Sequence, residues 1–292
     1  MLYRPSRRSC CLYRARAFPR NRDRECASTE WNIPYAVASL AHRLNAFLQS
    51  VGELGLFAAR AFRESIRPPF ELAEITRQIF EVGWRSGPLI IVSGFAFGVV
   101  LALQTRASME KFGAAAMIPQ AVSLGLFRDV GPLIAALLLS GRVGAGIGAE
   151  LAGMRVTEQI DALESLAVNS FKYLVVTRVI ACVLALPILT TLLNFSGLAG
   201  GMMSEMFASH MSMQLFMNDA FGPMDWSDYI PSTAKTVVFG FIIGTVSCYL
   251  GYTATGGATG VGRASTRSVV FSSLLVILSE VILVKMILFW FP

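Results

Sequence analysis

Charged side chains are scarce in this sequence. Asp, Glu, Lys and Arg make up 15% of its 292 residues, against roughly 25% in soluble domains. By contrast, 54% of the residues are hydrophobic and the mean hydropathy is +0.57. A chain with so few charges and so much apolar sequence is predicted to be an integral membrane protein.

The sequence also lacks the residue patterns of common catalytic sites. It has no GxxxxGK[ST] phosphate loop and no HExxH metal motif, and its only histidines are His42 and His210. These absences disfavour ATP hydrolysis by the chain itself and metal- or histidine-assisted catalysis. The five cysteines have no metal-ligand spacing and are assigned no function; they are Cys10, Cys11, Cys26, Cys182 and Cys248. We therefore predict no catalytic residue, no metal site and no cofactor.

Positive charge gathers near the N-terminus. Fourteen of the 25 Lys and Arg residues lie before Pro88, and all fourteen are Arg. This excess predicts an N-terminal part that stays in the cytoplasm beside anionic lipid, and not a nucleic-acid-binding surface. Residues 1–34 are predicted to form a disordered basic tail, because they lack the apolar core of a secretory signal. An organelle transit peptide and a misassigned start codon are the alternatives.

Residues 35–84 are predicted to form two helices before the first membrane span. In residues 35–63, apolar side chains recur at steps of three and four, the spacing of one helical face. They are Val37, Leu40, Leu44, Phe47, Val51 and Leu54. Such a helix lies in the membrane interface or packs on protein as an ordinary amphipathic helix. Pro68 and Pro69 end it, and a second helix is expected over residues 71–84.

Five apolar runs can cross a membrane, which needs about 20 residues for a tilted helix. They cover residues 86–105, 130–149, 179–204, 236–252 and 268–292. The expected fold is all-α: an integral membrane bundle of five spans over residues 85–292, preceded by the amphipathic interfacial helix. Glycines four residues apart, such as Gly94 and Gly98, permit tight packing within the bundle or in a dimer.

The loops between the spans give the orientation. With the N-terminus in the cytoplasm, five crossings put the C-terminus on the opposite side. Arg106, Glu205 and Lys235 border the apolar runs and count as loop charges on that outer side. The loop charges differ little between the two sides, so the N-terminal Arg residues decide the orientation.

A polar segment between the second and third spans is the most specific signal in the chain. Residues 149–167 read AELAGMRVTEQIDALESLA and carry ionised side chains that would be costly in lipid. We expect a helix at about residues 150–166 that lies on the membrane surface and docks a soluble partner; a lipid-facing connector is the alternative. The candidate docking residues are Glu150, Met154, Arg155, Glu158, Gln159, Asp161 and Glu164.

Charged residues in or beside the spans are candidates for a substrate contact. Arg128 and Asp129 lie at the outer mouth of the second span, where they contact the head group of a substrate or form an ordinary interfacial ion pair. Glu280 lies near the middle of the fifth span, and a carboxylate there should face a cavity or a partner. Lys285 is near enough to the outer end to extend its ammonium group to the interface. Arg142 is assigned a structural role.

Two stretches of the sequence carry a family resemblance. They are GPLIAALLLSGRVGAGIGAELAGMRVTEQIDALESLAVNSFKYLVVTRV and GYTATGGATGVGRASTRSVVFSS. They resemble the MlaE-type permeases, membrane subunits of bacterial ABC systems that move phospholipids between the inner and outer membranes, with relatives in the chloroplast envelope. The resemblance covers about residues 80–288. It implies that residues 150–164 are the coupling helix for an ATPase, and that Arg128, Asp129 and Glu280 belong to a lipid cavity.

The resemblance also implies partners and a location. The partners would be a cytoplasmic ABC ATPase that uses the ATP, an MCE-domain lipid-binding protein on the outer side, a STAS-domain protein in many systems, and a second copy of the chain. The location would be the bacterial inner membrane, with a cytoplasmic N-terminus and a periplasmic C-terminus. The Arg-rich residues 1–30 and the Met-rich residues 204–228 depart from the family pattern.

The leading hypothesis is therefore a phospholipid permease driven by a separate ATPase. The alternative is a channel or secondary transporter that works without an ATPase and uses Glu280 for coupling. The sequence lacks paired, broken spans in two halves, which disfavours that alternative. An intramembrane enzyme is disfavoured because no nucleophile and base occur together.

Overall fold

The computed structural model describes residues 33–67, 71–167, 169–222 and 226–290. Most of these residues are helical, and no strand occurs among them. Contacts divide the chain into Met1–Leu48 and Gln49–Pro292. The account below concerns the second unit, apart from α1, which begins in the first. Of the predicted basic tail, residues 1–32 lie outside the described residues.

Five helical segments in the described part of the chain are long and apolar enough to cross a membrane, as predicted. They cover Leu72–Phe112, Ala115–Val156, Lys172–Ser209, Tyr229–Tyr252 and Gly257–Ile287. The protein is therefore an all-α integral membrane protein.

Most of the spans are built from one long helix. The first is α2 (Leu72–Met109) with the turn η1 (Glu110–Phe112), the third is η5 (Lys172–Val176) with α7 (Thr177–Ser209), the fourth is α9 (Trp226–Tyr252) and the fifth is α10 (Gly257–Trp290). Two short helices connect spans: α6 (Gln159–Ser165) and α8 (Met213–Phe221).

The second span is interrupted by two π-helical turns. Its elements in order are η2 (Ala115–Met117), α3 (Ile118–Gly125), η3 (Leu126–Val130), α4 (Gly131–Leu139), η4 (Ser140–Gly144) and α5 (Ala145–Val156). The turns η3 and η4 are the π-helical ones. Each π turn inserts a residue into the helix and changes the direction of nearby side chains.

The first span and the helix predicted before it are one continuous helix. The sequence predicted one helix over residues 71–84 and a span from residue 86, but α2 runs from Leu72 to Met109 and contains Pro88. Its buried residues recur every four positions from Gln78 to Ala102, as a single stripe that continues past the proline against α7. Packing of this kind lets a membrane helix accommodate a proline.

The amphipathic helix predicted over residues 35–63 is present as α1 (Ile33–Ile66). In its second half, Ala61 is buried, whereas Leu56 and Phe62 are exposed. Phe57 packs on Phe171 at the beginning of the third span. This half of α1 therefore contacts the bundle through one face, and its location in the membrane interface stays a prediction.

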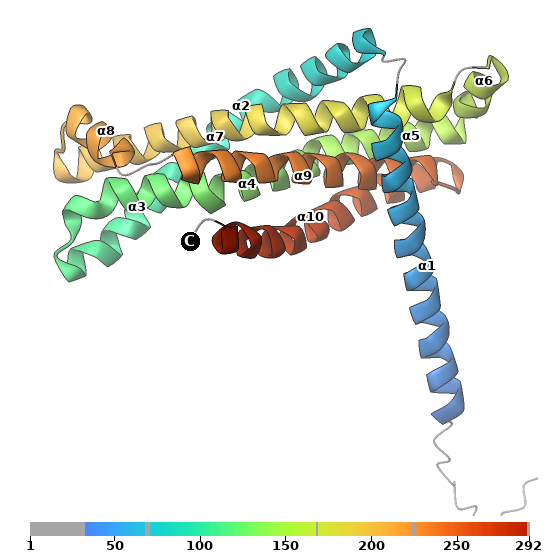
Figure 1. Cartoon of the computed structure of the whole chain (residues 1–292), viewed down its shortest axis with the longest axis horizontal. Coiled ribbons are helices and arrows are strands. Elements are labelled where there is room, and N and C mark those ends of the chain that lie inside the picture. The colour runs from blue at the N-terminus through green and yellow to red at the C-terminus, as the bar shows by residue number, and fades with distance from the viewer. Residues whose placement is uncertain (1–32, 68–70, 168, 223–225, 291–292) are drawn as a thin grey trace, which may run out of the picture. The chain divides into compact units, whose positions relative to one another are not determined.

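The helix α7 lies at the centre of the bundle. In Figure 1, α9 runs beside α7 and α2 crosses it obliquely, and both pack against α7. Of the most apolar stretch of the third span, 67% is buried, against 17% for the fifth span. Figure 1 also shows α3 and α8 at one end of the bundle and α6 at the other.

Glycines allow α7 to approach its neighbours closely. A Cβ atom on Gly98 of α2 would lie 1.8 Å from the carbonyl oxygen of Gly197 on α7. A Cβ atom on Gly240 of α9 would lie 2.7 Å from the carbonyl oxygen of Cys182. No side chain fits at these separations, so the glycine pairs seen in the sequence pack helices against each other within one chain.

A buried ion pair joins α2 and α7 at the end of the bundle that holds α3 and α8. Arg106 Nη2 lies 2.6 Å from Glu205 Oε2, and Arg106 Nε lies 3.2 Å from Glu205 Oε1. Both residues were predicted to be loop charges, which is wrong, because both helices continue past them. This bidentate contact compensates for burying the Glu205 carboxylate.

We expect Gly98→Ala to lower the stability of the bundle by about 1–3 kcal/mol, the usual range for an overfilled interior. The added methyl group can be accommodated only if α2 and α7 separate. Thermal unfolding in detergent measures the effect, with Gly83→Ala on the same helix as the control, because no atom lies within 4 Å of a Cβ there. Equal melting temperatures for the two variants would contradict the close approach.

Candidate functional site

Three charged side chains from three helical segments meet inside the bundle. Lys235 of α9 lies 2.7 Å (Nζ to Oε1) from Glu280 of α10 and 3.2 Å (Nζ to Oδ1) from Asp129 of η3. The Lys235 side chain is 1% exposed and the Glu280 side chain 11%, whereas the Asp129 side chain is 51% exposed. The cluster therefore has a buried centre and one member that a ligand can reach.

The π turn η3 places Asp129 toward this cluster. A π turn leaves backbone carbonyl groups without their usual partners along the helix. The Ser232 hydroxyl donates to these groups, and its oxygen lies 2.6 Å from the carbonyl oxygen of Phe127 and 2.7 Å from that of Arg128. Ser232 and Lys235 are three residues apart and lie on one face of α9. Ser232 on this face binds the backbone of η3, and Lys235 binds the Asp129 carboxylate of the same turn.

The charges of the cluster do not balance. One ammonium group faces two carboxylates, and Glu280 Oε2 is buried without a hydrogen-bond partner among the described residues. An unpaired buried oxygen is costly, and such groups are uncommon outside functional sites.

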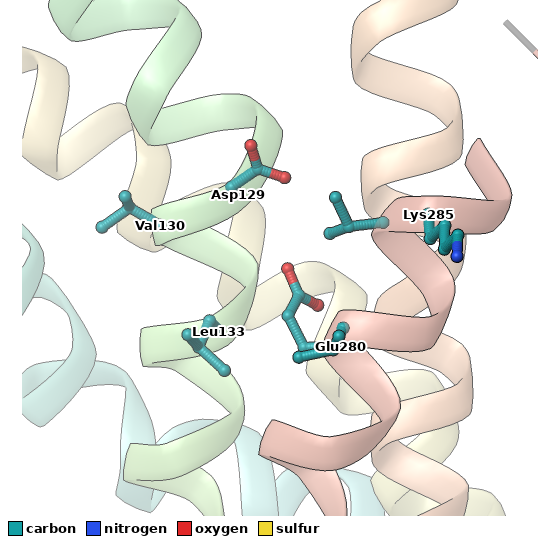
Figure 2. Close-up of a pocket in the computed structure, with 7 residues that line it drawn as sticks. Asp129, Val130, Leu133, Glu280 and Lys285 are labelled. Carbon is teal, nitrogen blue, oxygen red and sulfur yellow. The ribbon is translucent and has the colours of Figure 1, made fainter. Parts of the chain in front are cut away.

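A cavity of about 490 Å³ adjoins the cluster. Its lining combines aliphatic and charged residues: Asp129, Val130, Leu133, Glu280, Val281, Val284 and Lys285. Figure 2 shows the carboxyl groups of Asp129 and Glu280 pointing into the gap between the second span and α10. The cavity therefore presents apolar walls beside charged groups, which suits an amphiphilic ligand.

The structure brings together two of the three predicted substrate-contact residues. Asp129 and Glu280 face the same cavity, as the sequence led us to expect for Glu280. Arg128 belongs to the same π turn, but it is not among the residues that line the cavity. Lys285, which was treated separately, lines it too. Arg142 donates to the Ser86 hydroxyl on α2 (3.1 Å), in keeping with its structural assignment.

Sequence reasoning missed Lys235, the centre of the cluster. The fourth span was expected to begin at Thr236, immediately after this charge, but α9 begins at Trp226. The apolar residues Tyr229 and Ile230 were a signal that the helix starts earlier. A charge inside a membrane span would then have called for a carboxylate partner.

The polar segment predicted to be one helix over residues 150–166 is two helices. α5 ends at Val156, and α6 begins at Gln159 after Glu158, whose backbone is left-handed (φ 57°). Arg155 bridges the break by donating to Asp161 at 2.7 Å. The break turns α6 away from the axis of α5, so the docking residues lie on two elements.

The predicted docking residues differ in their accessibility. Glu150 pairs with the buried Arg178 at 2.8 Å, so this carboxylate holds α5 to the third span. Met154 packs against a hydrophobic cluster. The exposed members are Glu158, Gln159, Asp161 and Glu164. A partner would therefore meet a surface that is mainly acidic and centred on α6.

In the part of the chain that the structure describes, the His, Cys, Asp and Glu side chains are not grouped as metal ligands. No group of three His, Cys, Asp or Glu side chains there is arranged to hold a metal ion. The charged cluster offers two carboxylates, and both are already paired with the Lys235 ammonium group.

Comparison with known proteins identifies the family of the chain. A family model described as Permease MlaE matches residues 75–286, which include the charged cluster and α6. The chain belongs to the MlaE permease family. It is therefore the membrane permease of an ABC transporter.

Relatives in several organisms support this family membership. A probable ABC transporter permease protein of Rickettsia felis is 40% identical over 248 residues, which cover 85% of this chain and 96% of the relative. One of Synechocystis is 34% identical over 239 residues (82% and 91%). The intermembrane phospholipid transport system permease protein MlaE of Haemophilus influenzae is 30% identical over 244 residues (82% and 93%).

We expect Lys235→Met to destabilise the protein strongly, because it leaves two carboxylates without their cation. Breaking one side of a buried ion pair costs about 3–5 kcal/mol. Adding Glu280→Gln should restore part of this loss, with a coupling energy of about 0.5–3 kcal/mol. Unfolding of the wild type, both single variants and the double variant in one detergent measures this coupling.

Lys111→Met is the matched control for this cycle, because Lys111 is exposed at the end of the first span. Its stability should equal that of the wild type. Strictly additive effects of the Lys235 and Glu280 substitutions would show that the two side chains do not interact.

Proposed function

We propose that this permease moves phospholipids between the inner and outer membranes of a bacterium, driven by ATP hydrolysis in a separate ABC ATPase subunit. The observation that carries the proposal is the cavity with apolar walls and a charged rim between the second span and α10. The phospholipid transport named for the relative in Haemophilus influenzae supports the same substrate class.

The chemistry of the cavity fits a phospholipid. Val130, Leu133 and Val281 offer contacts for acyl chains. The half-exposed carboxylate of Asp129 suits a head-group amine. A volume of 490 Å³ lies in the range of roughly 300–1,000 Å³ typical of pockets for small organic ligands. One chain would thus hold the head group and the adjoining part of the acyl chains.

The proposal includes partners and an orientation. The ATPase would bind the acidic surface of α6 on the cytoplasmic side, which is also the side of the N-terminus. A second copy of the chain would complete the lipid cavity as a homodimer. An MCE-domain lipid-binding protein would meet the outer side, and a STAS-domain protein would join the complex. These assignments rest on the family resemblance and on the position of α6 at one end of the bundle.

The ATPase-independent transporter is the competing proposal. Its coupling site would be Glu280, which is tied to Lys235 by an ion pair. Membership in an ABC permease family favours the ATP-driven reading. Lipid transport by the purified chain without an ATPase, at a rate that follows the proton gradient, would support the competing proposal instead.

We expect Leu133→Trp to slow phospholipid transport several-fold, because the indole ring would fill the cavity. The measurement is transfer of a fluorescent phospholipid in vesicles that contain the permease and its ATPase. Leu103→Trp is the control, because Leu103 lies on the exposed face of α2 and the same increase in volume meets no protein there. If both variants transport at the wild-type rate, the cavity is not the lipid site.

We expect the double variant Glu158→Lys and Asp161→Lys to lose the ATPase during affinity purification. Reversing the charge of both exposed carboxylates replaces the acidic surface of α6 with a basic one. The fold should survive, because the Arg155–Asp161 pair that is lost is at the surface and such pairs contribute about 0–1 kcal/mol.

Asp219→Lys on α8, at the opposite end of the bundle, serves as the control for this purification and should retain the ATPase. Retention of the ATPase by a folded Glu158→Lys, Asp161→Lys protein would place the docking surface elsewhere.

A further inference from the structure

We propose that the second half of α1 (residues 49–66) is part of the apparatus that couples ATP hydrolysis to transport. In this role α1 positions the end of α9 and does not serve only to attach the chain to the membrane. The proposal rests on the proposed function, in which an ATPase docks on α6. Its basis is that α6 and α1 are both fastened to Ser170, Phe171 and Lys172, three consecutive residues at the beginning of the third span.

The first half of the connection runs from α6. This helix has seven residues, with left-handed backbone on either side of it at Glu158 (φ 57°) and Ala167 (φ 59°). Glu164 Oε1 accepts a hydrogen bond from Ser170 at 2.6 Å. The Tyr252 hydroxyl, at the end of α9, lies 3.4 Å from the same oxygen. A displacement of α6 by a docked partner therefore reaches both the third span and α9.

The second half of the connection runs from the same three residues to α1. The ring of Phe57 packs edge-on against Phe171, with 5.1 Å between centroids, and the Arg60 guanidinium lies 4.3 Å from the centroid of the Phe171 ring. Lys172 Nζ donates to the carbonyl oxygen of Arg67, directly after α1, at 2.5 Å. Aromatic and cation–π contacts of this kind stabilise a packed interface beyond simple burial.

The helix α1 also holds the end of α9. Phe57 lies 5.5 Å from Tyr249 and 6.4 Å from Tyr252, measured between ring centroids. The Tyr249 hydroxyl donates to Glu53 at 3.0 Å. These contacts lie at the C-terminal end of α9. The same helix carries Lys235 nearer its beginning, so α9 joins these contacts to the charged cluster. We call this group of packed side chains the junction: Phe57, Phe171, Tyr249 and Tyr252. Phe57 contacts the other three rings, so α1 is a part of the junction.

A junction transmits a displacement only while its members stay packed. Phe57 fills the space between the third span, α9 and α1, and its removal would leave a void into which Tyr252 and Phe171 could move. Motion of α6 would then be absorbed at the junction instead of passing to α9. The docking surface itself would be unchanged, because Phe57 is not part of α6.

The test compares Phe57→Ala with Leu56→Ala in the complete permease–ATPase complex in lipid vesicles. Leu56 is the adjacent residue and is 74% exposed, so its truncation removes a similar volume without touching the junction. Three quantities are measured: ATPase retained on purification, ATP hydrolysed, and fluorescent phospholipid moved. We expect Phe57→Ala to retain the ATPase and to lower the ratio of lipid moved to ATP hydrolysed several-fold. Leu56→Ala should match the wild type in all three.

A wild-type ratio for Phe57→Ala overturns the proposal. If that variant does not fold, Phe57→Leu replaces it, because leucine keeps much of the volume and loses the edge-on contacts. A lower ratio for Phe57→Leu supports the proposal and a wild-type ratio overturns it. Failure of the docking assignment is detected separately, by retention of the ATPase in the Glu158→Lys, Asp161→Lys protein. A wild-type ratio for Phe57→Ala with that assignment intact overturns only the role of α1.

Discussion

A buried ammonium group fixes the relative positions of three helical segments. The Lys235 side chain is almost completely enclosed, and an ionised group in such surroundings requires carboxylate partners. Its partners come from η3 and α10, so neither element can move away without leaving a charge unpaired. The apolar cavity between these elements keeps its charged rim for the same reason.

Close packing along α7 holds this arrangement in register. Gly98 and Gly240 bring α2 and α9 against the backbone of α7, where no side chain would fit. Backbone contacts of this kind depend on the length of the shared surface and not on one interlocking side chain. The helices beside α7 thus form a continuous framework, and α10, with most of its surface exposed, is the span least constrained by it.

Hydropathy predicts the number of spans because long apolar runs have no other stable location than the membrane or a helical core. Hydropathy does not predict where each spanning helix begins and ends. Arg106, Glu205 and Lys235 were each taken as the border of a span, yet each lies inside a helix and is neutralised by a partner. The partners of Lys235 are 106 and 45 residues away in the sequence, so no local pattern identifies them. The helix break at Glu158 depends on left-handed backbone at that residue. Such backbone is usually predicted from a glycine, and position 158 is a glutamate.

The helix α9 connects the two functional regions of the molecule. Lys235 and Tyr252 are 17 residues apart on it, which corresponds to roughly 25 Å along a helix at about 1.5 Å per residue. A shift of α9 along its axis would change the distances of Lys235 to both carboxylates. The contact with Asp129, at 3.2 Å, is longer than the one with Glu280 and would break first. Motion at the α6 end would therefore free the Asp129 carboxylate for a ligand while the Lys235–Glu280 pair keeps the bundle closed.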